Sequence, residues 1–167
     1  MRNAIVLFVI LSFISGVILL FAAFGLENWK PLLAFLVTGI FAIAAAIKYT
    51  VGKSAYGYRA LGDFFVFLFF GIVGVLGFYL LLSQKLDLPI ILLSLIIGAF
   101  SVMVLNLNNM RDIQNDKESG KTTIPVLLGS DKAKSYHFSL GFIIMGASIY
   151  FNYLIDNPLI WFNIIAL

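Results

Sequence analysis

Long apolar segments separated by short polar connections make up most of this sequence. Five runs approach the length of about 20 residues that a helix needs to cross a bilayer, and a sixth is shorter. The five runs are 4–24, 31–47, 63–82, 89–107 and 136–155, and the sixth is 158–167. The pattern predicts an all-α, polytopic transmembrane helix bundle, in one domain over residues 1–167.

Composition supports the bilayer as the solvent of this chain. Hydrophobic residues make up 62% of the 167 residues and charged residues 11%, whereas soluble domains carry about 45–50% apolar and about 25% charged residues. The formal net charge of +3 is too small to indicate a nucleic-acid partner. Cysteine is absent and His137 is the only histidine, which excludes disulfides and metal sites built from thiolates or several histidines.

Basic residues are concentrated in alternate connections between the apolar runs. Arg2 precedes the first run, three basic residues lie in the connection 48–62, and five more lie in 108–135. Cytoplasmic connections of membrane proteins carry an excess of Lys and Arg. The sequence therefore predicts a multi-pass protein of the inner membrane, with its N-terminus and these two connections in the cytoplasm.

The densest polar segment follows the fourth apolar run. Asn108, Asp112 and Asp116 are spaced four apart, so they share one face if the preceding helix continues through them. Carboxylates on one stripe repel each other unless a cation lies between them or nearby Arg and Lys compensate. Oxygen ligands suit Mg²⁺, which takes one or two carboxylates and completes its shell with water and phosphate oxygens.

Three basic residues surround these acids, namely Arg111, Lys117 and Lys121. Acids that hold a metal, with bases that neutralise phosphate charge, are typical of a metal-bridged diphosphate site. The alternative is a solvated loop with ordinary salt bridges, which is common for an Asp-x-x-x-Asp pattern on its own. The neighbouring Asn108 and Asn109, the cytoplasmic helix end and the turn at 120–123 favour the functional interpretation.

The connection 48–62 and the start of the next run form a second candidate segment. Its three glycines and three tyrosines indicate an ordered, sharply turning loop. Asp63 opens the third run, where a carboxylate near a helix N-terminus is favourable, so a capping role is as plausible as catalysis. Lys53 and Arg59 are either ordinary cytoplasmic charges or ligands of the same anion as the 108–121 segment.

The two segments together resemble the UbiA superfamily of membrane prenyltransferases. Residues 108–123, Asn-Asn-Met-Arg-Asp-Ile-Gln-Asn-Asp-Lys-Glu-Ser-Gly-Lys-Thr-Thr, are similar to its second aspartate-rich motif, and 49–63 resemble its 1,4-dihydroxy-2-naphthoate polyprenyltransferase branch. That family has nine helices and two aspartate-rich motifs, and the first motif is absent here. We therefore expect a chain that is incomplete at both ends and inactive by itself.

The resemblance implies a role for each candidate residue. Asp112 and Asp116 would bind Mg²⁺, supported by Asn108 or Asn109, while Tyr49 and Asp63 would orient the acceptor. The diphosphate of a polyprenyl diphosphate would meet Lys53, Arg59, Asn108, Asn109, Arg111, Lys117 and Lys121. The product would be demethylmenaquinol, an intermediate of menaquinone biosynthesis, formed with loss of CO₂ and diphosphate. The isoprenoid tail would lie in an apolar cavity on the lipid side.

Two other classes of protein remain open at this point. One is a prenyltransferase of the same superfamily with another aromatic acceptor. The other is a transporter or a helical membrane partner without chemistry, which predicts ionisable residues in the middle of the spans. The charges cluster instead at helix ends, which favours a site at the membrane surface. The oligomeric state and the length of the isoprenoid are not predicted.

Overall fold

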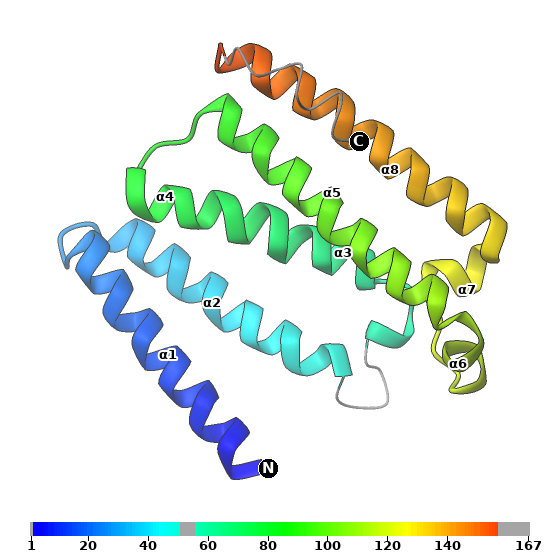
Figure 1. Ribbon diagram of the computed structural model, residues 1–167. Helices are drawn as coiled ribbons and strands as arrows, with labels where there is room; N and C mark the ends of the chain where they lie inside the picture. Colours follow the sequence, from blue (N-terminus) through cyan, green and yellow to red (C-terminus); the bar gives the residue numbers. More distant parts are fainter. Residues whose placement is uncertain (1, 51–55, 157–167) are drawn as a thin grey trace.

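The structure, a computed structural model, describes residues 2–50 and 56–156, and its ordered elements are helical (Figure 1). In chain order they are α1 (Arg2–Phe24), α2 (Trp29–Thr50), η1 (Tyr56–Tyr58), α3 (Gly62–Val66), η2 (Phe67–Gly77), α4 (Phe78–Ser83), α5 (Leu88–Arg111), α6 (Ile113–Glu118), α7 (Ile124–Leu128) and α8 (Ser130–Leu154). Pairing between extended segments is limited to one isolated bridge in the described part of the chain. The prediction of an all-α membrane helix bundle is confirmed.

Four helical segments are long and apolar enough to cross a membrane: Val6–Phe24, Trp29–Tyr49, Gly62–Ser83 and Leu88–Arg111. They match the first four predicted runs to within a few residues. The fifth run is also helical as far as Leu154, where α8 ends, but it is not among the four segments apolar enough to qualify. Its crossing of the membrane stays a prediction, and the sixth run lies outside the described residues.

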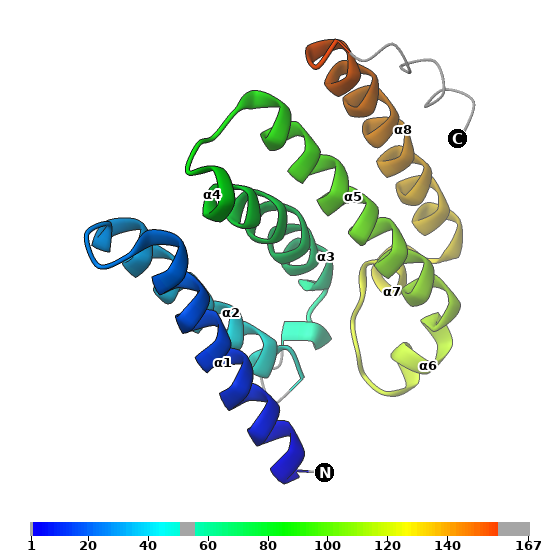
Figure 2. The same ribbon diagram turned by 60° about the vertical axis from the view of Figure 1, so that its left-hand side comes forward.

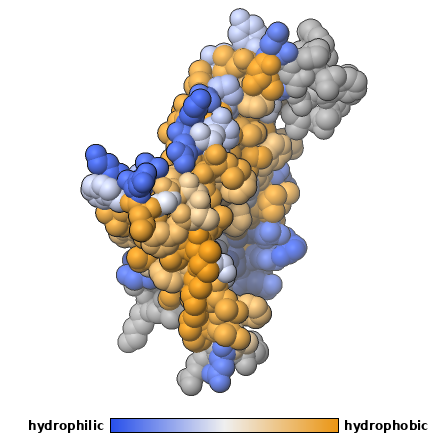
Figure 3. Space-filling view, turned by 90° about the vertical axis from the view of Figure 1, so that its left-hand side faces the viewer, coloured by the Kyte–Doolittle hydropathy of each residue, from blue (hydrophilic) through white to orange (hydrophobic). Residues whose placement is uncertain are grey.

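Helix α5 lies at the centre of the packing. It contacts η2 on one side and α8 on the other, whereas α1 packs mainly on α2. Figures 1 and 2 show the resulting order of long helices, α1, α2, the α3–η2–α4 helix, α5 and α8. Ile96 and Ala99 of α5 and Ile144 of α8 form a small buried core. Apolar side chains cover much of the face in Figure 3, as expected for a surface in contact with lipid.

A long π-helical stretch separates α3 from α4 within one continuous helix. It spans the eleven residues of η2, although π-helices occur mostly as single turns. Gly71 of η2 crosses α5 closely, since a Cβ on Gly71 would lie 2.6 Å from the Ser94 carbonyl oxygen and 2.7 Å from the Gly98 Cα. Small residues thus allow the two backbones to touch, as is usual between membrane helices. The sequence predicted the span but not its π-helical centre.

The connection predicted at 108–135 is mostly helical and is not an open loop. It contains the end of α5, then α6 and α7, and the start of α8. Gly120 and Gly129 turn the chain between these pieces with φ angles of 71° and 77°, which glycine adopts without steric cost. Thr123 caps α7, and its Oγ1 accepts a hydrogen bond from the Val126 amide at 3.4 Å. The compact fold of this segment brings its polar groups close to the third long helix.

Candidate functional site

Backbone hydrogen bonds join the two polar segments that the sequence analysis singled out. The Ala60 amide donates to the Thr122 carbonyl oxygen at 2.7 Å, and the Thr122 amide donates to the Tyr58 carbonyl oxygen at 3.2 Å. These bonds form a parallel bridge between Arg59 and Thr122. Ala60 takes a left-handed φ of 56° at this point, which is unusual for a residue with a side chain. The connection before α3 and the segment after α6 therefore meet directly.

A small polar pocket lies where these segments meet. It is lined by Tyr49, Gly57, Ala60, Gly62, Asp63, Asn109, Lys121, Thr122, Thr123 and Ile124. Four of the ten are residues that the sequence marked as candidates: Tyr49, Asp63, Asn109 and Lys121. They come from three long helices and one turn, so no single motif could have shown that they share a pocket.

Asp116 is linked to this pocket by an ion pair with Lys121, which lines it. The Lys121 ammonium donates to Asp116 Oδ1 at 3.1 Å and to Oδ2 at 3.2 Å. Asp116 is buried, with 8% of its surface exposed, and the Lys121 amide also donates to the Asp116 backbone carbonyl at 2.8 Å. The turn at Gly120 reverses the chain so that Lys121 lies beside Asp116. A carboxylate and an ammonium group are thus held together beside the pocket.

Asp112 lies on the exposed side of the same segment. The Arg111 guanidinium donates to both of its carboxylate oxygens, at 2.8 and 2.9 Å. This hydrogen bonding lowers the pKa of Asp112, and the charge of Lys121 acts in the same direction. The sequence left open whether a metal or neighbouring bases compensate the acids. In the structure Arg111 compensates Asp112 and Lys121 compensates Asp116.

The predicted stripe of Asn108, Asp112 and Asp116 is present in the backbone. The Asp112 amide donates to the Asn108 carbonyl at 3.0 Å, and the Asp116 amide donates to the Asp112 carbonyl at 2.8 Å. The helix is nevertheless interrupted at Asp112, where φ and ψ are −99° and 10°. The three side chains therefore differ in exposure: Asn108 is exposed, Asp112 is half-buried and Asp116 is buried.

The remaining candidate residues lie at the edge of the site or outside the residues that the structure describes. Lys117 and Arg59 are exposed, where their cationic groups face solvent near the pocket's segments. Lys53 falls outside the described residues. Within residues 2–50 and 56–156 no three acidic, histidine or cysteine residues gather as a metal cluster. The two proposed ligands, Asp112 and Asp116, still fit Mg²⁺, because that ion often takes one or two carboxylates and otherwise oxygens of water and substrate.

Tyr136 is a part of the site that sequence reasoning missed. Its hydroxyl donates to Asp63 Oδ2 at 3.0 Å across 73 residues of chain. In the sequence Tyr136 was simply the first residue of the fifth apolar run. No local pattern marks it, because the contact depends on how α8 packs beside α3 and α5.

An apolar groove begins at the same tyrosine that lines the polar pocket. It has a volume of about 590 Å³ and lies between α2 and the α3–η2 helix. Its lining residues are Ala42, Ala46, Tyr49, Phe65, Val66, Phe69, Phe70 and Val73. Tyr49 therefore stands at the junction of a polar compartment and an apolar one.

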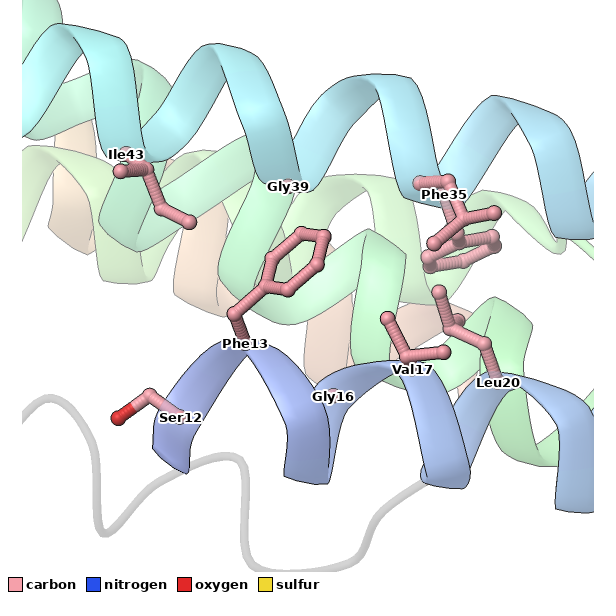
Figure 4. A pocket seen from close by; sticks show the side chains of 9 residues that line it. Ser12, Phe13, Gly16, Val17, Leu20, Phe35, Gly39 and Ile43 are labelled. Atoms are coloured by element: carbon pink, nitrogen blue, oxygen red, sulfur yellow. The ribbon is translucent and has the colours of Figure 1, made fainter. Parts of the chain in front are cut away.

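A second apolar cavity lies away from this site, between α1 and α2 (Figure 4). It has a volume of about 230 Å³, and no titratable side chain lines it. Phe13 and Val17 of α1 and Ile43 of α2 point into it. Because its lining offers only the Ser12 hydroxyl for polar chemistry, the polar pocket remains the candidate functional site.

Comparison with known proteins assigns the chain to a family. The family model of the UbiA prenyltransferase family matches residues 1–167. The chain belongs to the UbiA prenyltransferase family. No solved structure matches it. The family assignment covers the helices that carry the polar pocket and the apolar groove alike.

Curated relatives within the UbiA family carry a specific name. A 1,4-dihydroxy-2-naphthoate octaprenyltransferase of Haemophilus influenzae is 42% identical over 163 residues, which cover 98% of this chain and 52% of the relative. The protein of the same name in Escherichia coli is 40% identical over 140 residues, covering 84% of this chain and 45% of that protein. The chain thus spans about half the length of these relatives.

Proposed function

We propose that this chain supplies one face of the active site of a 1,4-dihydroxy-2-naphthoate polyprenyltransferase. The observation that carries the proposal is the junction at Tyr49, where a pocket with cationic and anionic groups opens beside an apolar groove. A polyprenyl diphosphate has the same division, with a charged head and a long apolar tail. The names of the relatives supply the acceptor.

The diphosphate head would lie against the segment 108–121. Arg111, Lys117 and Lys121 can donate charge-assisted hydrogen bonds to phosphate oxygens, with Asn108 and Asn109 as neutral donors. Arg59 faces the same side, and we assign Lys53 to this group from the family resemblance. Anions displace carboxylates from Arg and Lys most easily where those pairs are exposed, as Arg111 and Asp112 are.

Asp112 and Asp116 would hold Mg²⁺ together with oxygens of the diphosphate. The bound ion would neutralise charge on the diphosphate as it leaves. Each carboxylate is paired with a base in the structure, so these bases are free to turn to the phosphate when a metal takes their place. This exchange explains why acids and bases alternate along one short segment.

The tail would occupy the groove between α2 and η2. Burial of each CH₂ group contributes about 0.8 kcal/mol, so even part of a polyprenyl chain binds well to such a surface. The Phe65 and Phe69 rings stack at a centroid distance of 6.1 Å along this groove. Aromatic faces also stabilise an allylic cation near the head of the tail.

The acceptor would bind next to Asp63 and Tyr49. Its ring carbon that carries the carboxylate would form the new carbon–carbon bond to the prenyl group, while diphosphate leaves and the carboxylate departs as CO₂. Asp63 would accept a hydrogen bond from an acceptor hydroxyl and so fix the ring beside the prenyl carbon. We further propose an inner-membrane location with the polar pocket on the cytoplasmic side, from the distribution of basic residues.

Filling the groove tests this assignment. Ala46→Phe in the full-length protein should raise the KM for a long polyprenyl diphosphate at least about tenfold, because the new ring occupies space that several CH₂ groups would use. The KM for dihydroxynaphthoate should stay unchanged. Ala44→Phe is the matched control, since Ala44 is exposed on the same helix and does not line the groove. Steady-state kinetics with membrane-reconstituted protein measure both constants. Equal effects of the two variants would contradict the placement of the tail.

A further inference from the structure

One hydrogen bond connects α8 to the polar pocket. The Tyr136 hydroxyl donates to Asp63 Oδ2 at 3.0 Å. Asp63 lies in the first turn of α3 and lines the pocket, whereas Tyr136 is not among the described residues that line it. A hydrogen bond to a carboxylate is strong and directional. Tyr136 therefore restricts how the Asp63 carboxylate can turn without itself reaching the space that a ligand would occupy.

A buried asparagine fixes the face of α8 that carries Tyr136. Asn106 on α5 is completely buried, and its Nδ2 donates to the Ala133 carbonyl at 3.3 Å and lies 3.4 Å from His137 Nδ1. Ala133 is completely buried as well. Positions 133, 136 and 137 share one face of a helix. The contacts of Asn106 thus set the rotation of α8 that directs Tyr136 toward Asp63.

The side chain of Asn106 joins two apolar helices at a loss of stability. Its Oδ1 is buried and has no hydrogen-bond partner within the described part of the chain. Leaving a buried acceptor unpaired is destabilising by about 1–3 kcal/mol, and an apolar side chain at this position would avoid that loss. In some helix pairs a buried polar contact fixes the register and does not add stability, and we infer that role for Asn106. The register that it selects is the one in which Tyr136 meets Asp63.

We propose that Tyr136 is a positioning residue for prenyl transfer, which holds the Asp63 carboxylate in the orientation that receives the hydroxyl of the aromatic acceptor. The inference rests on the proposed function, because it assumes that Asp63 touches the acceptor. Tyr136 acts through Asp63 alone. Its loss should therefore affect the acceptor and spare the binding of the polyprenyl diphosphate.

The test is Tyr136→Phe in the full-length protein, which removes the hydroxyl and keeps the ring. We expect kcat/KM for the acceptor to fall about ten- to a hundredfold, as is usual for the loss of a hydrogen bond to a charged group. The KM for polyprenyl diphosphate should stay within about twofold of the wild-type value. A parallel rise of both KM values, or an unchanged kcat/KM for the acceptor, would overturn the proposal.

Tyr150→Phe provides the matched control on the same helix. Tyr150 is exposed and stacks on Tyr153 at the other end of α8, so the same chemical change there should leave both constants unaltered. If Tyr150→Phe lowers kcat/KM for the acceptor as much as Tyr136→Phe does, the effect belongs to α8 in general and the positioning role is wrong.

Thermal unfolding of four proteins tests the contact without any assay of activity. The wild type, Tyr136→Phe, Asp63→Ala and the double variant form a cycle, and the two changes should be non-additive because each one removes the same hydrogen bond. Additive changes would overturn the proposal. If the protein prenylates a different aromatic compound, the proposed acceptor is wrong. The role of Tyr136 is then tested with that compound: Tyr136→Phe should lower kcat/KM for the compound and leave the KM for polyprenyl diphosphate unchanged.

Discussion

Asp116→Ala and Asp112→Ala should each lower Mg²⁺-dependent prenyl transfer by at least about a hundredfold, the usual effect of removing one group that stabilises transition-state charge. Asp116 is buried against Lys121 and Asp112 is paired with Arg111. Removal of either carboxylate takes away a proposed metal ligand and also frees a base. Turnover of the full-length protein at saturating Mg²⁺ measures the loss. Near-normal rates in either variant would remove the metal role of that residue.

Asp131→Ala is the control for these two variants. Asp131 forms an exposed pair with Lys134 near the start of α8, at 3.4 Å. It lies in the first turn of α8, on the same predicted cytoplasmic side, yet it does not line the pocket. Its replacement should leave turnover unchanged. Membrane extraction and thermal unfolding of all three variants show whether a lost rate reflects lost folding, which matters most for Asp116 because its removal leaves Lys121 unpaired.

Gly57→Ala should have the next largest effect, because it forces apart the chain segments that form the pocket. A Cβ at this buried glycine would lie 2.6 Å from the Tyr49 carbonyl oxygen and 3.1 Å from its ring. Overpacking of this kind is destabilising by about 1–3 kcal/mol. The strain would displace Tyr49 or break the backbone bonds between residues 58–60 and Thr122. We expect turnover to fall at least about tenfold and the unfolding temperature to drop.

Gly62→Ala is the matched control for the variant at Gly57. It lies in the same connection and lines the same pocket, but its Cβ would meet Leu105 at 3.4 Å and the Tyr49 hydroxyl at 3.9 Å, both ordinary contacts. Stability should be close to that of the wild type. A loss of stability at Gly62 equal to that at Gly57 would contradict the tight contact that the structure places on Gly57 and not on Gly62.

The long helices could be predicted because each one is specified locally. An uninterrupted apolar run identifies a span wherever it lies, and the first four runs agree with the structure to within a few residues. The π-helical centre of the third span could not be found in this way. This stretch includes Gly71, which approaches Ser94 and Gly98 of another helix, and such a tertiary contact leaves no periodic signal.

The sequence pointed to most residues of the candidate site but not to their arrangement in space. Spacing identified Asp112 and Asp116, and the sign of the charges identified Arg111 and Lys121. The partner of each acid depends instead on the break in the helix at Asp112 and the turn at Gly120. Tyr136 escaped prediction altogether, because a contact across 73 residues is set by helix packing.

Formation of the prenylated product tests the central claim most directly. Purified full-length protein in lipid would be given a polyprenyl diphosphate and 1,4-dihydroxy-2-naphthoate, with Mg²⁺ or with EDTA, and the lipid extract would be analysed by mass spectrometry. The account predicts a decarboxylated, prenylated naphthoquinol that requires Mg²⁺ and disappears in Asp112→Ala and Asp116→Ala. Product that forms equally well in EDTA or in both variants, or no transfer to this acceptor by the wild type, would contradict it.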